Sequence, residues 1–155
     1  MLKPIAHHKQ AGARACVAVV ASEYNGEFVE GMLSAALTTL AEAGVKRVRV
    51  IRVPGAFEIP VAVATLTKAK RRRPEAVICL GVILRGKTAH ADHVGQTVSS
   101  LLGQIAVDSG IPVIHEVLLL DNASQAKTRC LGKRHNRGIE AAQTALTMRE
   151  VMRSL

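Results

Sequence analysis

Hydrophobic residues along the chain fall into short continuous runs separated by longer stretches with helical spacing. Apolar runs rich in Val and Ile occur at residues 15–21, 46–53, 75–84 and 112–120. Between and after them, apolar residues recur every three or four positions, which predicts helices near 27–43, 58–70, 93–109 and 138–152. Strands that alternate with helices predict a parallel sheet with helices on both faces.

The length of 155 residues is typical of one domain. We therefore expect a single α/β domain over residues 15–155, with four parallel strands and an extended N-terminal arm at 1–14. In such sheets, ligands bind beyond the carboxyl ends of the strands. The segments expected to carry the site are the loops 22–27, 54–58, 84–92 and 120–138.

Composition narrows the class of protein. Hydrophobic residues make up 48% and charged residues 21%, which excludes intrinsic disorder. The apolar run 15–21 is far shorter than a membrane span of about 20 residues, and the polar segment before it is atypical of a signal peptide. The three cysteines form no CxxC pair, which suits a reducing compartment. We expect a cytoplasmic protein.

The formal net charge of +9 is compatible with nucleic acid, with anionic substrates or with a solvated basic surface. The densest basic run, Lys68 to Arg73, ends at Pro74, where the predicted helix should finish. Cations at a helix C-terminus complement its dipole, and we favour this interpretation. The chain has no Trp, one Tyr and two Phe, so an aromatic platform for nucleobases is not expected.

One segment matches a nucleotide-binding motif. Gly81 to Thr88 satisfies the pattern G-x4-G-K-[ST], and Asp121 ends an apolar run as a magnesium ligand could. However, a phosphate-binding loop needs exposed backbone amides, whereas Val82, Ile83 and Leu84 favour a continued strand. We keep a nucleotide hydrolase as a remote alternative, together with an anion site at the Gly-Lys-Thr turn.

Three further clusters could carry chemistry. Phe57 occupies a Pro-Gly turn, and a plain strand–helix junction does not explain an aromatic side chain there. His90 and His93 could share a helix face, but no second Cys/His pair with metal-ligand spacing follows, so we expect no metal. An acid/base role suits His90, although a solvated histidine is favoured from these residues alone. The basic segment 125–138 fits either a phosphate clamp or a solvated loop.

Taken in order, these loops resemble the 6,7-dimethyl-8-ribityllumazine synthase family. The similarity covers nearly the whole chain after residue 15. It rests on Tyr24-Asn25, VPGAFEIP at 53–60, GVILRGKTAHADHV at 81–94, PVIHEV at 112–117 and QAKTRCLGKRHNRGIEAA at 125–142. The combination of VPGAFEIP with a G-x-x-x-R-G-x-T-x-H loop is highly specific.

The resemblance implies a flavodoxin-like three-layer αβα fold and a condensation in riboflavin biosynthesis. The substrates would be 5-amino-6-(D-ribitylamino)uracil and 3,4-dihydroxy-2-butanone 4-phosphate, and the products 6,7-dimethyl-8-ribityllumazine, phosphate and water. No cofactor and no membrane partner are implied. A homopentamer is implied as well, with a decamer or a 60-subunit shell left open.

Roles for individual residues follow from the same resemblance. Tyr24 would stack on the pyrimidine, with Asn25 beside it, and His90 would be the acid/base. The ribityl chain would contact Ala56, Phe57 and Glu58, and the heterocycle would meet the backbone of Val82, Ile83 and Leu84. The phosphate would meet Lys87, Thr88 and, across a subunit boundary, Arg129. The same neighbour would supply His115 and Arg137.

Several positions depart from the family pattern. Ala91 and His93 stand where aromatic residues are usual, His115 replaces a Phe and Arg137 replaces a Lys. Histidine can still stack on a heterocycle, and arginine keeps the positive charge. A divergent paralogue that binds a related pterin or flavin, or that serves mainly as an assembly, is the alternative expectation.

Overall fold

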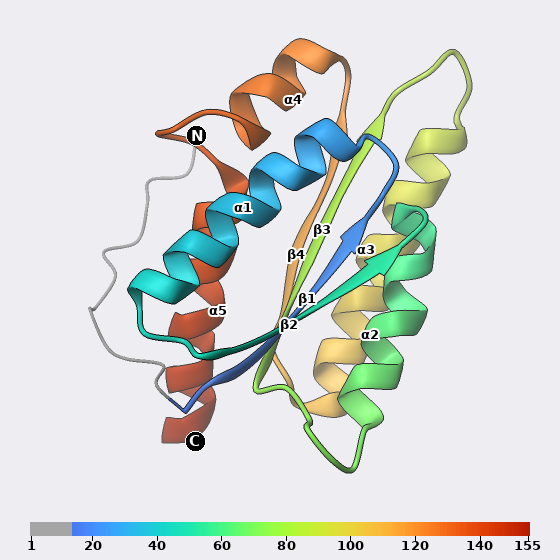
Figure 1. Cartoon of the computed structure of the whole chain (residues 1–155). Coiled ribbons are helices and arrows are strands. Elements are labelled where there is room, and N and C mark those ends of the chain that lie inside the picture. The colour runs from blue at the N-terminus through green and yellow to red at the C-terminus, as the bar shows by residue number, and fades with distance from the viewer. Residues whose placement is uncertain (1–13) are drawn as a thin grey trace.

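The fold is seen in a computed structural model, which describes residues 14–155 (Figure 1). Its sheet has four strands, which all pair in parallel in the order β2-β1-β3-β4. The strands are β1 (Cys16–Ser22), β2 (Arg47–Val53), β3 (Ala76–Leu84) and β4 (Val113–Leu120). The expected arm at 1–14 lies, except for its last residue, outside the described residues.

Helices cover both faces of this sheet (Figure 1). On one face lie α1 (Gly26–Glu42), α4 (Ala123–Cys130) and α5 (Arg137–Ser154). On the other lie the short 3-10 helix η1 (Ala56–Glu58), α2 (Ile59–Lys68) and α3 (His90–Ser109). The expectation of an α/β domain with a four-stranded parallel sheet between two helical layers is confirmed, and the arrangement is that of a flavodoxin-like fold.

The two central strands carry the core. Successive side chains of a strand point to opposite faces, so Val19 and Ile78 pack towards α1 and α5, whereas Val20 and Cys79 pack towards α2 and α3. All four are fully buried. Burial on both faces explains why these strands are continuous apolar runs, as expected for central parallel strands.

Two boundaries differ from the expectation. Residues 120–138 were expected to be a loop, which is wrong, because they contain α4. This helix has only eight, mostly polar residues, which are too few to show a clear apolar stripe. Its start depends on the Asn122 side chain, which accepts a hydrogen bond from the Gln125 amide at 3.0 Å. Helix α3 begins at His90 instead of near residue 93.

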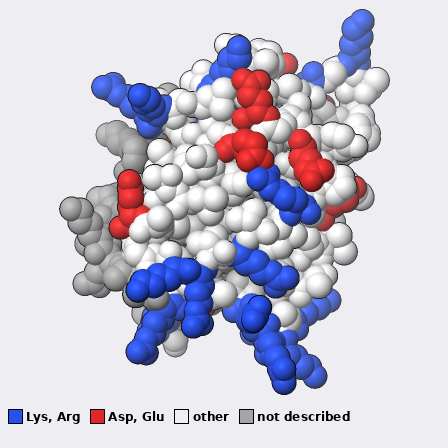
Figure 2. Space-filling model, in the orientation of Figure 1, with Lys and Arg blue, Asp and Glu red and all other residues white. Residues whose placement is uncertain are grey.

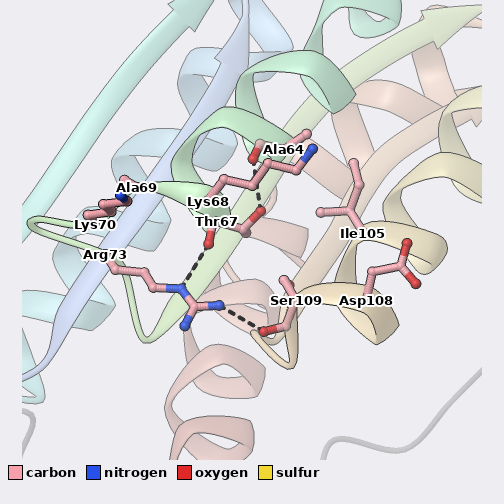
Figure 3. Close-up of a pocket in the computed structure, with 9 residues that line it drawn as sticks. All are labelled: Ala64, Thr67, Lys68, Ala69, Lys70, Arg73, Ile105, Asp108 and Ser109. Carbon is pink, nitrogen blue, oxygen red and sulfur yellow. Dashed lines mark hydrogen bonds between the residues drawn. The ribbon is translucent and has the colours of Figure 1, made fainter.

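The basic run after α2 contains a helix cap, as expected. Arg73 donates from Nε to the carbonyl of Thr67 at 2.8 Å and from Nη2 to that of Ser109 at 2.9 Å (Figure 3). The two carbonyls belong to the last turns of α2 and α3, where backbone acceptors lack partners within the helix. One guanidinium therefore satisfies the C-terminal ends of two helices and complements both dipoles.

No helix within residues 14–155 is both long and apolar enough to cross a bilayer.

Helices α1 and α5 approach closely at Gly138. A Cβ placed on Gly138 would lie 1.9 Å from the carbonyl oxygen of Met32, which is backbone and cannot rotate away. The amide of Gly138 donates to the Asn136 side chain at 2.8 Å, which ties this backbone in place. Glycine at this position is therefore required by the close contact between the two helices.

Replacing Gly138 with Ala should lower the stability of the fold by about 1–3 kcal/mol or more, because the methyl group must displace one helix from the other. The midpoint of urea unfolding measures the loss. Gly26→Ala is the matched control, since a Cβ there meets nothing within 4 Å. Equal midpoints for the two variants would contradict the close packing of α1 on α5.

Candidate active site

The turns after β1 and β2 are joined by backbone hydrogen bonds. The amide of Glu23 donates to the carbonyl of Val53 at 2.9 Å, and the amide of Tyr24 donates to that of Pro54 at 3.0 Å. Each turn presents an aromatic side chain to solvent: 71% of Tyr24 and 56% of Phe57 is exposed. Since large aromatic side chains are usually buried, two exposed ones on adjoining turns indicate a binding surface.

Asn25 fixes the first of these turns to the central strand. Its backbone is left-handed, with φ at 56°, and its side-chain Nδ2 donates to the carbonyl of Val82 at 2.7 Å. Asparagine tolerates this conformation better than most residues. The bond holds the turn beside the end of β3, where Ile83 and Leu84 are only half-buried.

The turn after β2 is closed by Glu58. One carboxylate oxygen of Glu58 accepts from the amide of Gly55 at 3.0 Å, which starts η1 at Ala56. A Cβ on Gly55 would lie 3.0 Å from Cδ2 of Tyr24, so the Tyr24 ring lies against the glycine backbone. The Glu58 carboxylate therefore shapes the turn that presents Phe57.

The loop after β3 carries Lys87, Thr88 and, at the first residue of α3, His90, all of which are exposed. Residues 81–84 of the G-x4-G-K-[ST] segment belong to β3 itself, so its interpretation as a nucleotide-binding loop is wrong: these residues form a strand and not a cradle of free amides. The remaining turn precedes a long helix, whose amino end favours anions. Within residues 14–155, no three His, Cys, Asp or Glu side chains gather closely enough to hold a metal ion.

Arg85 ties the base of this loop to its surroundings. Its guanidinium bonds to Asp92 in the first turn of α3 and to Asp121 at the end of β4, each at 2.6 Å. The hydrogen bonds to Arg85 hold the pKa of both carboxyl groups below their usual range. This role was not predicted from the sequence. The available signal was that Arg85 and Asp121 each follow one of two consecutive parallel strands.

His115 of the edge strand β4 and Arg137 at the start of α5 lie on opposite faces of the sheet. The Nε2 atom of His115 is 2.8 Å from Oγ of Ser99 on α3. Next to it on the strand, Glu116 points to the other face, where it accepts from Nε of Arg137 at 2.9 Å. Arg137 also pairs with Glu140, so its charge is already matched within the chain.

Burial raises the pKa of the Glu116 carboxyl group, while the nearby Arg137 guanidinium acts in the opposite direction.

Arg129 is exposed in the last turn of α4, which packs on α1, α5 and β4. In Figure 1, α4 lies on the α1 side of the sheet, whereas the loop after β3 leads to α3 on the other side.

The expected site residues thus form two groups in one chain. The turns after β1 and β2 and the end of β3 adjoin, and they carry Tyr24, Asn25, Ala56, Phe57, Glu58, Val82, Ile83 and Leu84. The loop that follows β3 carries Lys87, Thr88 and His90 at the same end of the sheet (Figure 1). By contrast, His115 lies on the edge strand β4 and faces α3, whereas Arg129 and Arg137 lie on α4 and α5 of the other helical layer.

Comparison with known proteins identifies the family. The family model described as 6,7-dimethyl-8-ribityllumazine synthase matches residues 14–153. A curated 6,7-dimethyl-8-ribityllumazine synthase from Kineococcus radiotolerans is 43% identical over 132 residues, which cover 84% of this chain and 80% of the relative. The family match includes both groups of candidate residues. The chain therefore belongs to the 6,7-dimethyl-8-ribityllumazine synthase family.

Proposed function

We propose that this protein condenses 5-amino-6-(D-ribitylamino)uracil with 3,4-dihydroxy-2-butanone 4-phosphate to form 6,7-dimethyl-8-ribityllumazine, phosphate and two molecules of water. The observation that carries the proposal is the joined pair of turns that expose Tyr24 and Phe57 beside the end of β3. A flat pyrimidine needs an aromatic or apolar surface and backbone groups for its polar edge. Family membership supports the same reaction.

The pyrimidine substrate would lie against Tyr24, with Asn25 lining the same pocket. The Asn25 amide is already bonded to Val82, so its role is to hold the pocket wall in place. The backbone of Val82, Ile83 and Leu84 offers hydrogen-bond groups to the heterocycle. Ala56, Phe57 and Glu58 would contact the ribityl chain.

The phosphate of the second substrate would bind at Lys87 and Thr88, beside the amino end of α3. Backbone amides at a helix start and a nearby lysine favour a dianion. The pairing of Arg85 with Asp92 and Asp121 holds the loop without placing a carboxylate free to repel phosphate. Arg129 of a neighbouring subunit would complete the phosphate site.

His90 would move protons during the condensation. The pyrimidine amine attacks the ketone carbon, and a first water leaves as the imine forms. Phosphate then departs by elimination, and a second water leaves as the ring closes. Each step needs a proton to leave nitrogen or carbon, or to reach a departing oxygen. A histidine near the phosphate turn can serve both purposes near neutral pH.

A divergent paralogue is the second candidate function. Family membership does not favour it, and the one observation on its side is the pairing of Arg137. Arg137 stands where the family usually has a lysine, and here it is held by Glu116 and Glu140. A guanidinium with two carboxylate partners is less available to a substrate than a free ammonium. An assay with both substrates separates the candidates: lumazine fluorescence above the uncatalysed rate supports the synthase, whereas lumazine binding without turnover supports the paralogue.

The proposed enzyme works in the cytoplasm. All three cysteines are free thiols in the structure. Burial raises the pKa of the Cys130 thiol to about 11 and that of Cys79 still further. Thiols held in the neutral form inside the core are inert, and they suit a compartment in which disulfides do not form.

Replacing His90 with Ala should slow lumazine formation, with phosphate binding and assembly retained. General acid/base groups contribute roughly 10²–10⁴-fold, and we expect the low end or less because the two substrates also react spontaneously. Initial rates of lumazine fluorescence measure the effect. His93→Ala, three residues further along α3, is the matched control and should keep its rate. An unchanged rate for His90→Ala would remove this side chain from the mechanism.

Arg129→Ala should raise the Michaelis constant for the butanone phosphate about tenfold or more, because a hydrogen bond to a charged group contributes roughly 1.5–3 kcal/mol. The constant for the pyrimidine should change little. Steady-state kinetics with each substrate varied in turn measure both values. Lys127→Ala removes a cation from the same turn of α4 and serves as control. Equal increases for both substrates would refute the assignment.

The protein should be a homopentamer or a multiple of pentamers, because the two groups of site residues would then meet between neighbouring subunits. Exposed apolar side chains on α2 and α3 are consistent with a covered surface: Val61 is 67% and Val107 is 80% exposed in the single chain. Native mass spectrometry should find about five times the chain mass of 16.5 kDa, or a multiple of it. A stable and active monomer would overturn the two-subunit site.

A further inference from the structure

At the end of the sheet opposite the candidate active site, the chain forms a groove of about 740 Å³. Its walls are the first residues of β1 and β2, Leu66 of α2 and the segment 72–74. Figure 2 shows Lys and Arg over the lower part of the molecule, where Figure 1 places the starts of these strands and the loop before β3. No acidic side chain is visible in that lower part of the view.

The charge of the groove is not balanced within the chain. Its lining includes Arg47, Arg49, Arg72 and Arg73, and no acidic residue. Within residues 14–155, the first three make no ion pair and no side-chain hydrogen bond, whereas Arg73 caps the two helices. Residues 1–13 contain no Asp or Glu that could neutralise them.

The nearest acid along the chain is already engaged. Glu75 follows the groove segment, but its carboxylate lies 3.1 Å from Nε of Arg149 on α5 and accepts from the amide of Cys16 at 3.0 Å. Arg149 is buried, with an exposed fraction of only 4%. Glu75 therefore compensates a buried arginine on the other helical layer, and the arginines of the groove keep their charge.

The backbone at Arg72 gives independent support. Its φ is 54°, in the left-handed region that favours glycine. Among the described residues, only Asn25 shares this feature without being glycine, and Asn25 belongs to the candidate active site. Strained backbone of this kind concentrates at ligand sites. Glycine would adopt this conformation without strain. The presence of arginine there indicates that the guanidinium has a function.

The spacing of the arginines and the kinds of side chain that line the groove indicate the class of ligand. Arg47 and Arg49 lie two residues apart on one face of β2, so their Cα atoms are separated by about 6.6 Å. Arginine binds phosphate oxygens in a two-pronged geometry. No aromatic side chain lines the groove, so it lacks the aromatic platform on which single-strand nucleic-acid binders stack successive bases. We propose that this groove binds an oligophosphate, a chain of linked phosphate groups long enough to meet several arginines at once.

Calorimetric titration of the full-length, assembled protein with inorganic tripolyphosphate, at fixed ionic strength, tests the proposal. Tripolyphosphate should bind more tightly than orthophosphate, since only the linked phosphate groups can reach several arginines at once. Arg49→Gln and Arg72→Gly should each weaken binding about tenfold or more. Arg72→Gly should also keep or raise the midpoint of thermal unfolding, because glycine adopts a positive φ without strain. Neither change should alter lumazine formation.

Two controls keep the test specific. Arg52→Gln removes the same charge from the same strand, but Arg52 pairs with Glu30 on the other face, so binding should not change. Arg129→Ala should leave the tripolyphosphate binding that Arg49→Gln weakens intact, which separates the groove from the proposed substrate phosphate site.

Three outcomes would overturn the proposal. The first is no binding by the unaltered protein at about 1 mM tripolyphosphate. The second is an equal loss for Arg52→Gln and Arg49→Gln, which would show a general charge effect. The third is an RNA oligomer that binds more tightly than tripolyphosphate with an affinity that depends on its bases.

Discussion

Parallel hydrogen bonding between β1 and β3 determines where every loop of the candidate active site lies. The two strands pair from Val17 with Ala76 to Ala21 with Leu80, and both are buried on each face. A shift of one residue in this register would turn each buried side chain to the opposite face of the sheet, where it would pack against the other helical layer. Because β2 and β4 pair in the same direction, the turns with Tyr24 and Phe57 and the loop with Lys87 emerge at one end of the sheet.

The strands could be predicted from the sequence where burial is complete. A continuous apolar run such as 75–84 is typical of a strand buried on both faces, and the order of strands and helices then implies a site at the carboxyl ends. The exposure of Phe57 followed from its place on a Pro-Gly turn. The same reasoning applies to Gly81 to Thr88, which can be interpreted as a strand end or as a nucleotide-binding loop. The apolar residues inside the motif favour the strand, as the structure shows.

What could not be predicted depends on contacts between distant residues or on single side chains. Helix α4 is too short and polar for a periodic pattern, so only the Asn122 cap marks its start. Arg85 falls within a motif, yet its partners Asp92 and Asp121 are seven and 36 residues away. Whether adjacent residues such as His115 and Glu116 serve one site or two depends on which face each occupies. That is known only once the neighbouring helices are placed.

Tyr24 gives the molecule a built-in optical reporter. The chain has no Trp and only this one Tyr, so almost all of its near-ultraviolet absorbance and intrinsic emission arise from a ring at the candidate active site. That ring is exposed and lies against Gly55, where a heterocycle could approach it. Changes in tyrosine emission would therefore follow occupancy of this turn without any label, and with almost no background from aromatic side chains elsewhere in the fold.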